Sequence, residues 1–456
     1  MKLTIYDTQS RAPQAVEVTD RPVQIYCCGP TVYRDAHVGN LRTFLLSDLI
    51  SRTLKLLGHE VVLIQNITDV GHMSEDFEDQ DKLLNQAQVE RKDPFEIARK
   101  YEDRFHADLE RLNISPAHQY PRASETIEDM LSSIQLLIDK GSAYVAESGS
   151  VYFSAQTFPS YGAISGNRLD SLKPGHRYEY SGDGEKKFHA DWALWKNAGN
   201  RTQMVWSSPW GRGFPGWHIE CTAMSLNLLA QHIDIHVGGI DLRFPHHENE
   251  RAQSNSIIGK EAVDLWVHGE HLLFEGRKMS KSANNVVLVE DLIAKGLDPL
   301  ALRLALLENR YRSQMDLTWD SLRAAHATLQ RWRNAMTTWG DSNETLEDSE
   351  ITAALCEDLD TPKALLRLRA LEKDQYLTPQ AKREIFNYSD QVLALDLSRA
   401  IEVKPLSVHQ ESLLADRAKA RAAKNWSESD RLRDLLFADG IAINDGVDGQ
   451  RWSWIN

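Results

Sequence analysis

Short apolar runs and one helical stripe alternate along the first part of the chain. Residues 23–29 (VQIYCCG) form an apolar run that ends in glycine, and residues 61–65 (VVLIQ) form a second run. Between them, residues 41–58 repeat apolar side chains at helical spacing. A strand, a helix and a strand in this order predict a parallel βαβ unit. Ligands bind at the carboxyl ends of such strands, which here are residues 28–29 and 66–69.

The pattern changes after about residue 120. Apolar residues keep helical spacing over residues 127–138, and Ser124 is the predicted N-cap of this helix. Residues 143–153 (AYVAESGSVYF) are typical of a hairpin. Strand-like sequence with α/β character resumes at residues 232–239 (HIDIHVGG), so we interpret residues 122–203 as an insertion into the first domain.

Helices are predicted for most of the chain after about residue 315. Apolar and aromatic side chains recur at three- and four-residue steps over residues 322–339, which indicates a stripe that faces a helix bundle. Thr361 is the predicted N-cap of a further helix, with Pro362 at its first position. Residues 408–456 are interpreted as a small final unit with two helices around KNWSESD and a strand-like end.

Composition narrows the class of protein. A chain of 456 residues suggests about three domains, at roughly 150 residues each. Apolar residues make up 42% and charged residues 26%, and no window approaches the roughly 18 uninterrupted apolar residues of a membrane helix. The first residues turn polar too early for a signal peptide, so we expect a cytoplasmic protein. The net charge of -14 argues against unspecific adhesion to nucleic acid or membranes, although a local basic face could still bind RNA.

Thiols, histidines and carboxylates point to a metal site. The chain has too few cysteines for a disulfide framework: Cys27, Cys28, Cys221 and Cys356. In the motif FPHHENE a proline favours a helix start, so His246 and Glu250 fall at i and i+4 on one helix face. That spacing suits one zinc ion, and the thiols of Cys28 and Cys221 would complete a four-ligand site. A polar helix start and a buried apolar thiol are the alternatives at this point.

Two segments could bind a nucleotide. PTVYRDAHVGN (residues 30–40) lies between a predicted strand and a predicted helix, where free backbone N–H groups attract anions. Gly39 would let a phosphate approach the backbone, and His37 and Asn40 could donate to it. KMSKS (residues 278–282) places two lysines and two serines after a predicted hairpin, although such runs are usually solvated basic turns. No G-x-x-x-x-G-K-[ST] loop occurs in the chain.

Taken together, these blocks resemble the cysteinyl-tRNA synthetase family of class I aminoacyl-tRNA synthetases. The resemblance is carried, in order, by YCCGPTVY, NITD, DWALWK, WSSPWGRGFPGWHIEC, DIHVGGIDLRFPHHENE, RKMSKS and, near the end of the chain, RAKARAAKNWSESDRLRDLL. It spans practically the whole sequence. It implies an enzyme that activates L-cysteine with ATP, giving cysteinyl adenylate and pyrophosphate, and then transfers cysteine to the 3' end of tRNA(Cys).

The resemblance also implies one zinc ion per chain, held by Cys28, Cys221, His246 and Glu250. Zinc would select the substrate thiolate over a serine hydroxyl, a distinction that packing alone supports by only about 10–200-fold. Cys27 would then lie on the opposite face of its strand. His247 and Glu248 would lie behind the ligands or on the surface.

Further roles follow from the same resemblance. The implied catalytic residues are His37, Asn40, Lys278 and Lys281. The implied ATP-binding residues are Pro30, His37, Gly39, Asn40, Lys278, Met279, Ser280, Lys281 and Ser282. The implied lining of the cysteine pocket is Gly29, Thr68, Trp217, His218 and His236. Magnesium would accompany ATP, and the family leads us to expect a monomer.

We expect an α/β fold in which a Rossmann-like parallel-sheet catalytic domain with an insertion is followed by an α-helical bundle and a small C-terminal α/β module. The expected division is a split catalytic domain (1–121 and 204–262), a connective insertion (122–203), a KMSKS-bearing stem-contact domain (263–314), a helical anticodon-binding bundle (315–405) and a small anticodon-recognition module (406–456).

Two departures and two rival functions remain. Arg34 stands where the family commonly has aspartate, and NITDVGHM (residues 66–73) departs from the family after NITD.

One rival is a ligase of the mycothiol-pathway type, which joins cysteine to an aminosugar and lacks the full anticodon-binding end. Against it, Arg417, Arg421 and Lys424 share a predicted helix face that could meet tRNA phosphates. The other rival is an inactive paralogue that binds zinc and RNA, and the presence of every motif lysine and zinc ligand argues against it.

Overall fold

A computed structural model describes the chain except for residues 72–80, 173–183, 280–284, 401–405, 447–448 and 455–456. The chain divides into two compact units, Met1–Arg399 and Ala400–Asn456. Buried apolar clusters fill both units. None of the helices in the described part of the chain combines the length and the apolar character that a membrane crossing needs.

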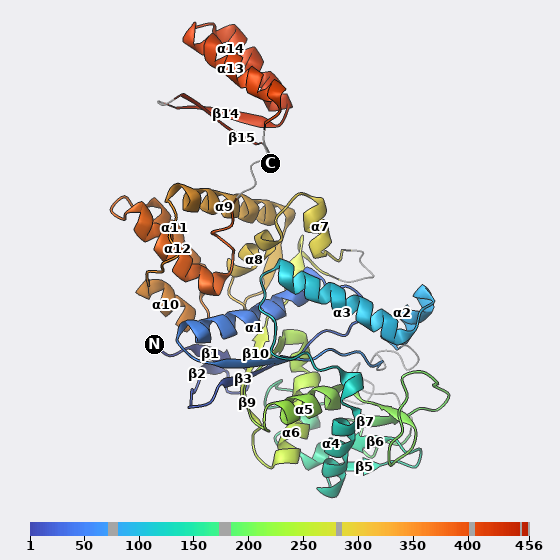
Figure 1. Cartoon of the computed structure of the whole chain (residues 1–456). Helices are drawn as coiled ribbons and strands as arrows, with labels where there is room; N and C mark the ends of the chain where they lie inside the picture. The colour runs from blue at the N-terminus through green and yellow to red at the C-terminus, as the bar shows by residue number, and fades with distance from the viewer. Residues whose placement is uncertain (72–80, 173–183, 280–284, 401–405, 447–448, 455–456) are drawn as a thin grey trace. The chain divides into compact units, whose positions relative to one another are not determined.

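A four-stranded parallel sheet forms the centre of the first unit (Figure 1). Its strands, in spatial order, are β10 (Val263–Gly269), β9 (Ile233–Gly239), β3 (Val23–Cys27) and β4 (Val61–Gln65). All of its pairings are parallel. β9 is buried along its whole length, as expected for a central strand of a sheet that is covered on both faces. The predicted Rossmann-like α/β fold is confirmed.

Helix α1 (Val38–Leu56) connects β3 to β4 and packs on this sheet. The prediction started the helix at residue 41, which is too late. His37 Nδ1 accepts from the backbone N–H of Asn40 at 3.2 Å, and Asn40 Oδ1 accepts from the backbone N–H of His37 at 3.1 Å. This reciprocal cap satisfies two N–H groups that would otherwise be unpaired, and therefore adds the first turn to the helix.

Two helices that pack on each other follow β4, and the second of them lies beside α1. They are α2 (Lys82–Glu90) and α3 (Pro94–Arg111). Figure 1 shows α3 beside α1, where the rings of Phe44 and Phe105 lie 4.9 Å apart. A short hairpin, β1 (Thr4–Asp7) and β2 (Ala12–Ala15), precedes the central sheet in the chain, and β1 contacts β10.

The inserted segment builds a second, antiparallel sheet. Its strands pair in chain order: β5 (Ala143–Val145), β6 (Val151–Phe153), β7 (Trp192–Asn197) and β8 (Gly213–Pro215). Three short 3-10 turns accompany them: η1 (Ala123–Glu125), η2 (Ala155–Thr157) and η3 (Leu169–Ser171). The sheet extends past residue 203, the expected end of the insertion. Helix α4 (Ile127–Asp139) packs against α5 (Trp217–Leu228) and α6 (His246–Ile258), and η4 (Ile240–Arg243) precedes α6.

The predicted N-cap role of Ser124 is wrong. Ser124 lies in η1, and its hydroxyl and backbone N–H donate to the carboxylate of Asp69 at 2.6 Å and 2.9 Å. Helix α4 begins after Thr126 without a side-chain cap. Because the carboxylate of Asp69 is fully buried, it needs donors, and Ser124 supplies two of them.

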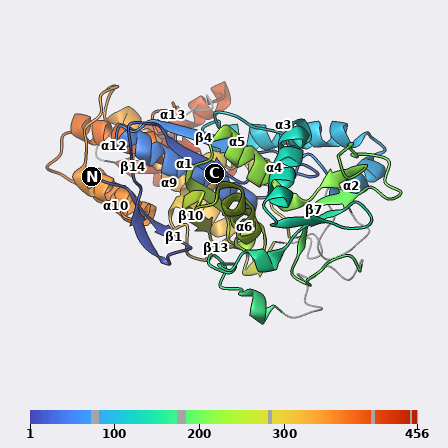
Figure 2. The same ribbon diagram turned by 90° about the horizontal axis from the view of Figure 1, so that it is seen from below.

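The second half of this unit is largely helical. A small sheet of β11 (Leu272–Phe274), β12 (Arg277–Lys278) and β13 (Met315–Leu317) leads into it. The helices are α7 (Val289–Ala294), α8 (Pro299–Leu307), α9 (Trp319–Thr338), α10 (Ser349–Cys356), α11 (Thr361–Lys373) and α12 (Pro379–Leu393). Figures 1 and 2 both show α10 and α12 toward one end of α1 and the inserted strands toward the other.

The predicted stripe on α9 is buried at Leu322, Leu329, Trp332 and Met336. The predicted N-cap role of Thr361 is wrong by one residue. Asp360 caps α11 by accepting from the backbone N–H of Lys363, and the Thr361 hydroxyl donates to the Leu307 carbonyl at 2.7 Å. A carboxylate accepts more strongly than a hydroxyl at a helix N-terminus, which explains the shift.

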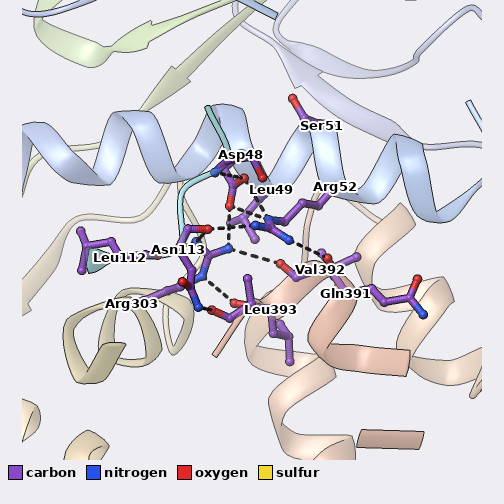
Figure 3. Close-up of polar contacts among 12 residues, drawn as sticks. Asp48, Leu49, Ser51, Arg52, Leu112, Asn113, Arg303, Gln391, Val392 and Leu393 are labelled. Atoms are coloured by element: carbon purple, nitrogen blue, oxygen red, sulfur yellow. Dashed lines mark hydrogen bonds and ion pairs between the residues drawn. The ribbon is translucent and has the colours of Figure 1, made fainter. Parts of the chain in front are cut away.

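A buried ion pair joins α8 to α1 (Figure 3). Arg303 is fully buried and donates to Asp48 Oδ2 at 2.7 Å. The same guanidinium donates to the carbonyls of Leu112 at 2.9 Å and Leu393 at 2.6 Å. Arg52 donates to Asp48 from the next turn of α1. Burial alone would raise the pKa of Asp48, but the charges of Arg303 and Arg52 outweigh burial and hold that pKa below its usual value.

The second unit contains α13 (Val408–Ala422), α14 (Trp426–Ala438) and a hairpin of β14 (Ile441–Gly446) and β15 (Gly449–Trp454). Arg417 is fully buried and donates to Asp445 at 2.9–3.0 Å, so its predicted phosphate-facing role is wrong. Arg421 also pairs with Asp445, at 2.8 Å. Lys424 lies beyond the end of α13. Of the three cations, only Arg417 is buried, whereas Arg421 is partly exposed and Lys424 is exposed.

Candidate active site

A cavity of about 290 Å³ opens at the carboxyl ends of β3, β4 and β9. Its lining comes from the loop between β3 and α1, from the ends of these strands, and from α3, α5 and α6. Thr31 and Thr68 form an isolated parallel bridge that extends the β3–β4 pairing into this lining. The position agrees with the ligand site expected for a parallel sheet.

Four potential metal ligands gather in one cluster, and three of them, Cys28, Cys221 and His246, line this cavity. The ligand atoms of Cys28, Cys221, His246 and Glu250 all lie within 4.8 Å of one another. Cys28 Sγ lies 3.8 Å from Cys221 Sγ and 3.5 Å from Glu250 Oε1, and His246 Nε2 lies 2.9 Å from Glu250 Oε1. Sulfur, imidazole and carboxylate ligands in this number are those of a tetrahedral zinc site.

Local structure explains how residues so far apart in sequence meet. Cys28 directly follows β3, and Cys221 lies in the second turn of α5. His246 and Glu250 stand one turn apart at the start of α6, as their spacing predicted. The chain enters α6 through Pro245, which is its N-cap residue.

A second set of four groups shares two of these ligands. Cys28, His236, His247 and Glu250 also lie within 4.8 Å of one another. Cys28 Sγ is 3.4 Å from Nε2 of both His236 and His247. However, Cys28, Cys221 and His246 line the cavity, whereas His236 and His247 are absent from its lining. We therefore favour the first set as the one that a substrate could reach.

Neighbouring side chains orient the ligands. His218 Nδ1 lies 2.9 Å from His246 Nδ1, which leaves Nε2 of His246 directed at Glu250. The ring of Trp217 stacks on His246 with centroids 4.3 Å apart. Such contacts fix the ring and its tautomer, as is usual for metal-binding histidines. Glu250 Oε2 is buried without a hydrogen-bond partner in the described structure, so it has capacity for a cation.

His247 and Glu248 are fully buried, so the expectation that they could lie on the surface is wrong. His247 Nδ1 lies 2.8 Å from His268 Nε2. Glu248 Oε2 accepts from the backbone N–H groups of Ile164 and Ser165 at 3.1 Å and 2.8 Å. Glu248 thus ties α6 to the inserted segment, while His247 packs behind the ligands.

The thiols differ in their ease of ionisation. The hydrogen bond with Cys28 lowers the pKa of Cys221 to about 7, while burial raises the pKa of Cys28. Burial raises the pKa of the Cys27 thiol to about 12. Cys27 packs among the residues of the α1 side of the sheet, and Cys28 packs on the other side. Cys221 is therefore the thiol best prepared to act as a thiolate ligand.

The two predicted nucleotide-binding segments meet at the start of α1. A Cβ on Gly39 would lie 2.9 Å from Cε of Met279, so the first residues of KMSKS pack against the first turn of the helix. The backbone N–H of Val38 donates to the carbonyl of Val287 at 3.0 Å, which joins the far end of the same loop. Lys278 is exposed at the end of β12, whereas Ser280, Lys281 and Ser282 lie outside the described residues.

His37 is a neutral donor in this arrangement. Burial, followed by the nearby charge of Arg34, lowers the pKa of His37 to about 4. Because its Nδ1 accepts a backbone N–H, the ring proton lies on Nε2. Asn40 and Pro30 line the cavity, while His37 and Gly39 stand beside that lining at the N-terminus of α1.

The predicted cysteine-pocket residues fall into two groups. Gly29, Thr68 and Trp217 line the cavity. A Cβ on Gly29 would lie 1.5 Å from the carbonyl oxygen of Asn66, so only glycine fits there. His218 and His236 are buried behind the metal ligands, where they contact His246 and Cys28.

Sequence reasoning missed several lining residues. Tyr101 and Phe105 reach the cavity from α3, and Lys82 reaches it from α2. Asp241 and Leu242 reach it from η4. The aromatic residues of α3 follow helical spacing, and only the fold distinguishes a core position from a cavity wall. In NITDVGHM, Val70 and Gly71 are buried, and residues 72–73 lie outside the described part of the chain.

Comparisons with known proteins agree with this architecture. One protein-family model, tRNA synthetases class I (C) catalytic domain, matches residues 14–327, and another, Cysteinyl-tRNA ligase anticodon binding domain, matches residues 404–452. The cysteine–tRNA ligase of Thermus thermophilus is 40% identical over 482 aligned positions, which cover 99% of each chain. That of Chlamydia muridarum is 37% identical over 483 positions with the same coverage.

Solved structures show the same fold at low sequence identity. A methionyl-tRNA synthetase of Mycobacterium tuberculosis in complex with methionyl-adenylate has a TM-score of 0.53 at 15% identity, covering 82% of this chain and 90% of that chain. A LeuRS–tRNA–LeuAMS ternary complex of Agrobacterium radiobacter K84 has a TM-score of 0.59 at 10% identity, with coverage of 83% and 84%. These likenesses support the fold alone.

Proposed function

This chain belongs to the cysteine–tRNA ligase family of class I aminoacyl-tRNA synthetases, and from that premise we propose that it charges tRNA(Cys) with L-cysteine, using ATP. The observation that carries the proposal is the cluster of Cys28, Cys221, His246 and Glu250, which opens into the cavity beside the N-terminus of α1. A sulfur-selective site and an anion-binding helix end therefore share one cavity.

In the first step the substrate carboxylate attacks the α-phosphate of ATP, forming cysteinyl adenylate and releasing pyrophosphate. Negative charge builds on the phosphates, and the positive end of the α1 dipole stabilises this charge. His37 donates from Nε2, and Asn40 contributes its side-chain amide. Lys278 and Lys281 hold the departing pyrophosphate, and Met279, Ser280 and Ser282 contribute to ATP binding. In the second step a terminal hydroxyl of the tRNA takes the acyl group and releases AMP.

The cluster of Cys28, Cys221, His246 and Glu250 fits zinc. The set offers two sulfurs, one imidazole and one carboxylate, and Oε2 of that carboxylate has no hydrogen-bond partner within the described residues. Zinc, when bound by these four residues, supplies a Lewis acid that lowers the pKa of the substrate thiol and prefers its sulfur to a hydroxyl oxygen. Gly29, Thr68 and Trp217 place the substrate above the ligands. His218 and His236 hold the ligand side chains from behind.

The proposal extends to the whole chain. We assign residues 1–121 and 204–262 to catalysis, 263–314 to stem contact, and 315–405 and 406–456 to anticodon binding. Magnesium accompanies ATP, and the enzyme works as a cytoplasmic monomer. Support comes from the match of an anticodon-binding family model to residues 404–452. The same match disfavours the aminosugar ligase, which lacks the full anticodon-binding end.

Thiol labelling gives one expected result. After zinc is removed by a chelator, iodoacetamide at pH 8 should modify Cys221 first, because its pKa is about 7 and it lines the cavity. Cys27, with its pKa raised to about 12, should stay unmodified and serves as the internal control. Zinc should protect Cys221, as read by mass spectrometry of peptides. Equal labelling of Cys221 with and without zinc would exclude it as a ligand.

The activity itself is tested by transfer of labelled cysteine, with ATP, onto a tRNA transcript with the GCA anticodon. A serine reaction and cysteine-dependent pyrophosphate exchange accompany it. The proposal predicts charging with cysteine and none with serine. Exchange without charging would indicate a small-molecule cysteine ligase instead. Neither charged tRNA nor pyrophosphate exchange would indicate the inactive paralogue.

A further inference from the structure

Arg34 places a guanidinium in the wall of the active-site cavity. It lies in the loop between β3 and α1, and the cavity lining includes it together with Pro30, Asn40 and Cys28. Its side chain is half-buried, and its guanidinium carbon lies 5.1 Å from the centre of the Tyr33 ring. Contact with the ring restricts the long side chain, which lowers the entropy lost when a ligand binds to it.

The charge of Arg34 is not neutralised within the described structure. Outside the gaps in the description, Arg34 forms no ion pair with a carboxylate. The adjacent Asp35 also lines the cavity, but Arg104 of α3 holds its carboxylate at 2.6 Å. The nearest acid in the sequence is therefore tied to another arginine, and the guanidinium of Arg34 is left for an anion.

Arg34 also affects the pKa of His37, the N-cap residue of α1, where phosphates are expected. Its positive charge is the second cause, after burial, of the low pKa of His37. His37 is the N-cap residue of α1, and Arg34 lies three residues before it in the loop that leads into the helix. A guanidinium, a neutral imidazole donor and the positive end of the α1 dipole together favour a polyanion over a single carboxylate.

We propose that Arg34 is an ATP-binding residue of this enzyme, donating from its guanidinium to the triphosphate beside the N-terminus of α1. This inference rests on the proposed function, because it takes ATP as the ligand of the cavity. From the loop between β3 and α1, its guanidinium would donate two parallel N–H groups to the phosphate oxygens. Lys82, which lines the cavity from α2, is the other cation of the described lining and is not part of the inference.

The test is the KM for ATP in cysteine-dependent pyrophosphate exchange. Loss of a charged hydrogen bond should make Arg34→Ala raise this KM by ~10-fold or more. Arg34→Lys should give a KM for ATP between those of the wild type and Arg34→Ala, because an ammonium cannot make the bidentate contact. Arg34→Asp should give the highest KM for ATP, because its carboxylate repels the phosphates. The KM for cysteine and the zinc content should not change. Arg323→Ala, which removes an exposed guanidinium on α9, is the matched control.

Equilibrium binding of ATP without cysteine, by calorimetry, gives a second readout that needs no turnover. Arg34→Ala should weaken it by the same factor. Unchanged ATP affinity and an unchanged KM for ATP would overturn the inference. So would normal exchange with impaired tRNA charging, which would assign the guanidinium to tRNA. If the wild-type enzyme bound ATP but showed no exchange, the proposed function would fail, and the binding series would still decide the role of Arg34.

Discussion

Replacing Cys221 by serine should abolish zinc binding and cysteine activation together. Cys221 Sγ lies 3.8 Å from Cys28 Sγ and lines the same cavity. A serine hydroxyl stays protonated and is a poor zinc ligand, so the site would lose one of its two anionic sulfurs. Changes behind metal ligands typically cost 10–100-fold in affinity, so loss of a ligand should cost more than ~100-fold. Zinc content is measured by atomic absorption and activation by pyrophosphate exchange.

Cys27→Ala is the matched control for this variant. Cys27 is as deeply buried as Cys221, but it packs on the α1 side of the sheet, away from the cavity. The Cys27→Ala variant should retain stoichiometric zinc and a near-normal rate of pyrophosphate exchange. Full zinc content and normal exchange in Cys221→Ser would refute the ligand assignment, while loss of both in Cys27→Ala would show only that this strand tolerates no change.

Replacing Asp48 by alanine should destabilise the first unit by about 3–5 kcal/mol, because it leaves the guanidinium of Arg303 buried without its countercharge. The remaining partners of Arg303 are carbonyl oxygens, such as those of Leu112 and Leu393, and these cannot balance a full charge (Figure 3). Urea unfolding followed by tryptophan fluorescence measures the loss.

The exposed pair of Arg323 and Asp320 on α9 offers the comparison. Asp320→Ala removes the same kind of carboxylate from an arginine, but water screens both groups, so the urea midpoint should hardly move. A midpoint for Asp48→Ala that matches Asp320→Ala would mean that the buried pair contributes no more than a surface pair.

The parallel sheet was predictable because its strands are buried on both faces and read as continuous apolar runs. The helix ends were less predictable. Ser124 and Thr361 both have the side chains of caps, yet the buried carboxylate of Asp69 engages one and the Leu307 carbonyl engages the other. A tertiary partner holds each hydroxyl, and at α11 the neighbouring Asp360 provides the local cap instead. Sequence alone does not reveal these partners.

The metal cluster was predictable in part. The spacing of His246 and Glu250 placed them on one helix face, the thiols of Cys28 and Cys221 offered two further ligands, and the family resemblance implied that these four residues hold the zinc. The burial of His247 beside His268 was not predictable, because the α6 sequence is polar on every side and resembles a surface helix. Arg417 shows the opposite error, since a charge that suggested a tRNA contact is instead buried and paired with Asp445 of the hairpin.

The measurement that tests the central claim most directly is X-ray absorption at the zinc edge of the resting enzyme. Ligation by Cys28, Cys221, His246 and Glu250 predicts two sulfur scatterers at about 2.3 Å, with one nitrogen and one oxygen at about 2.0–2.2 Å. The competing set of Cys28, His236, His247 and Glu250 predicts one sulfur and two nitrogens. A spectrum with two sulfurs would support the substrate-facing site, and a spectrum with one sulfur would contradict it.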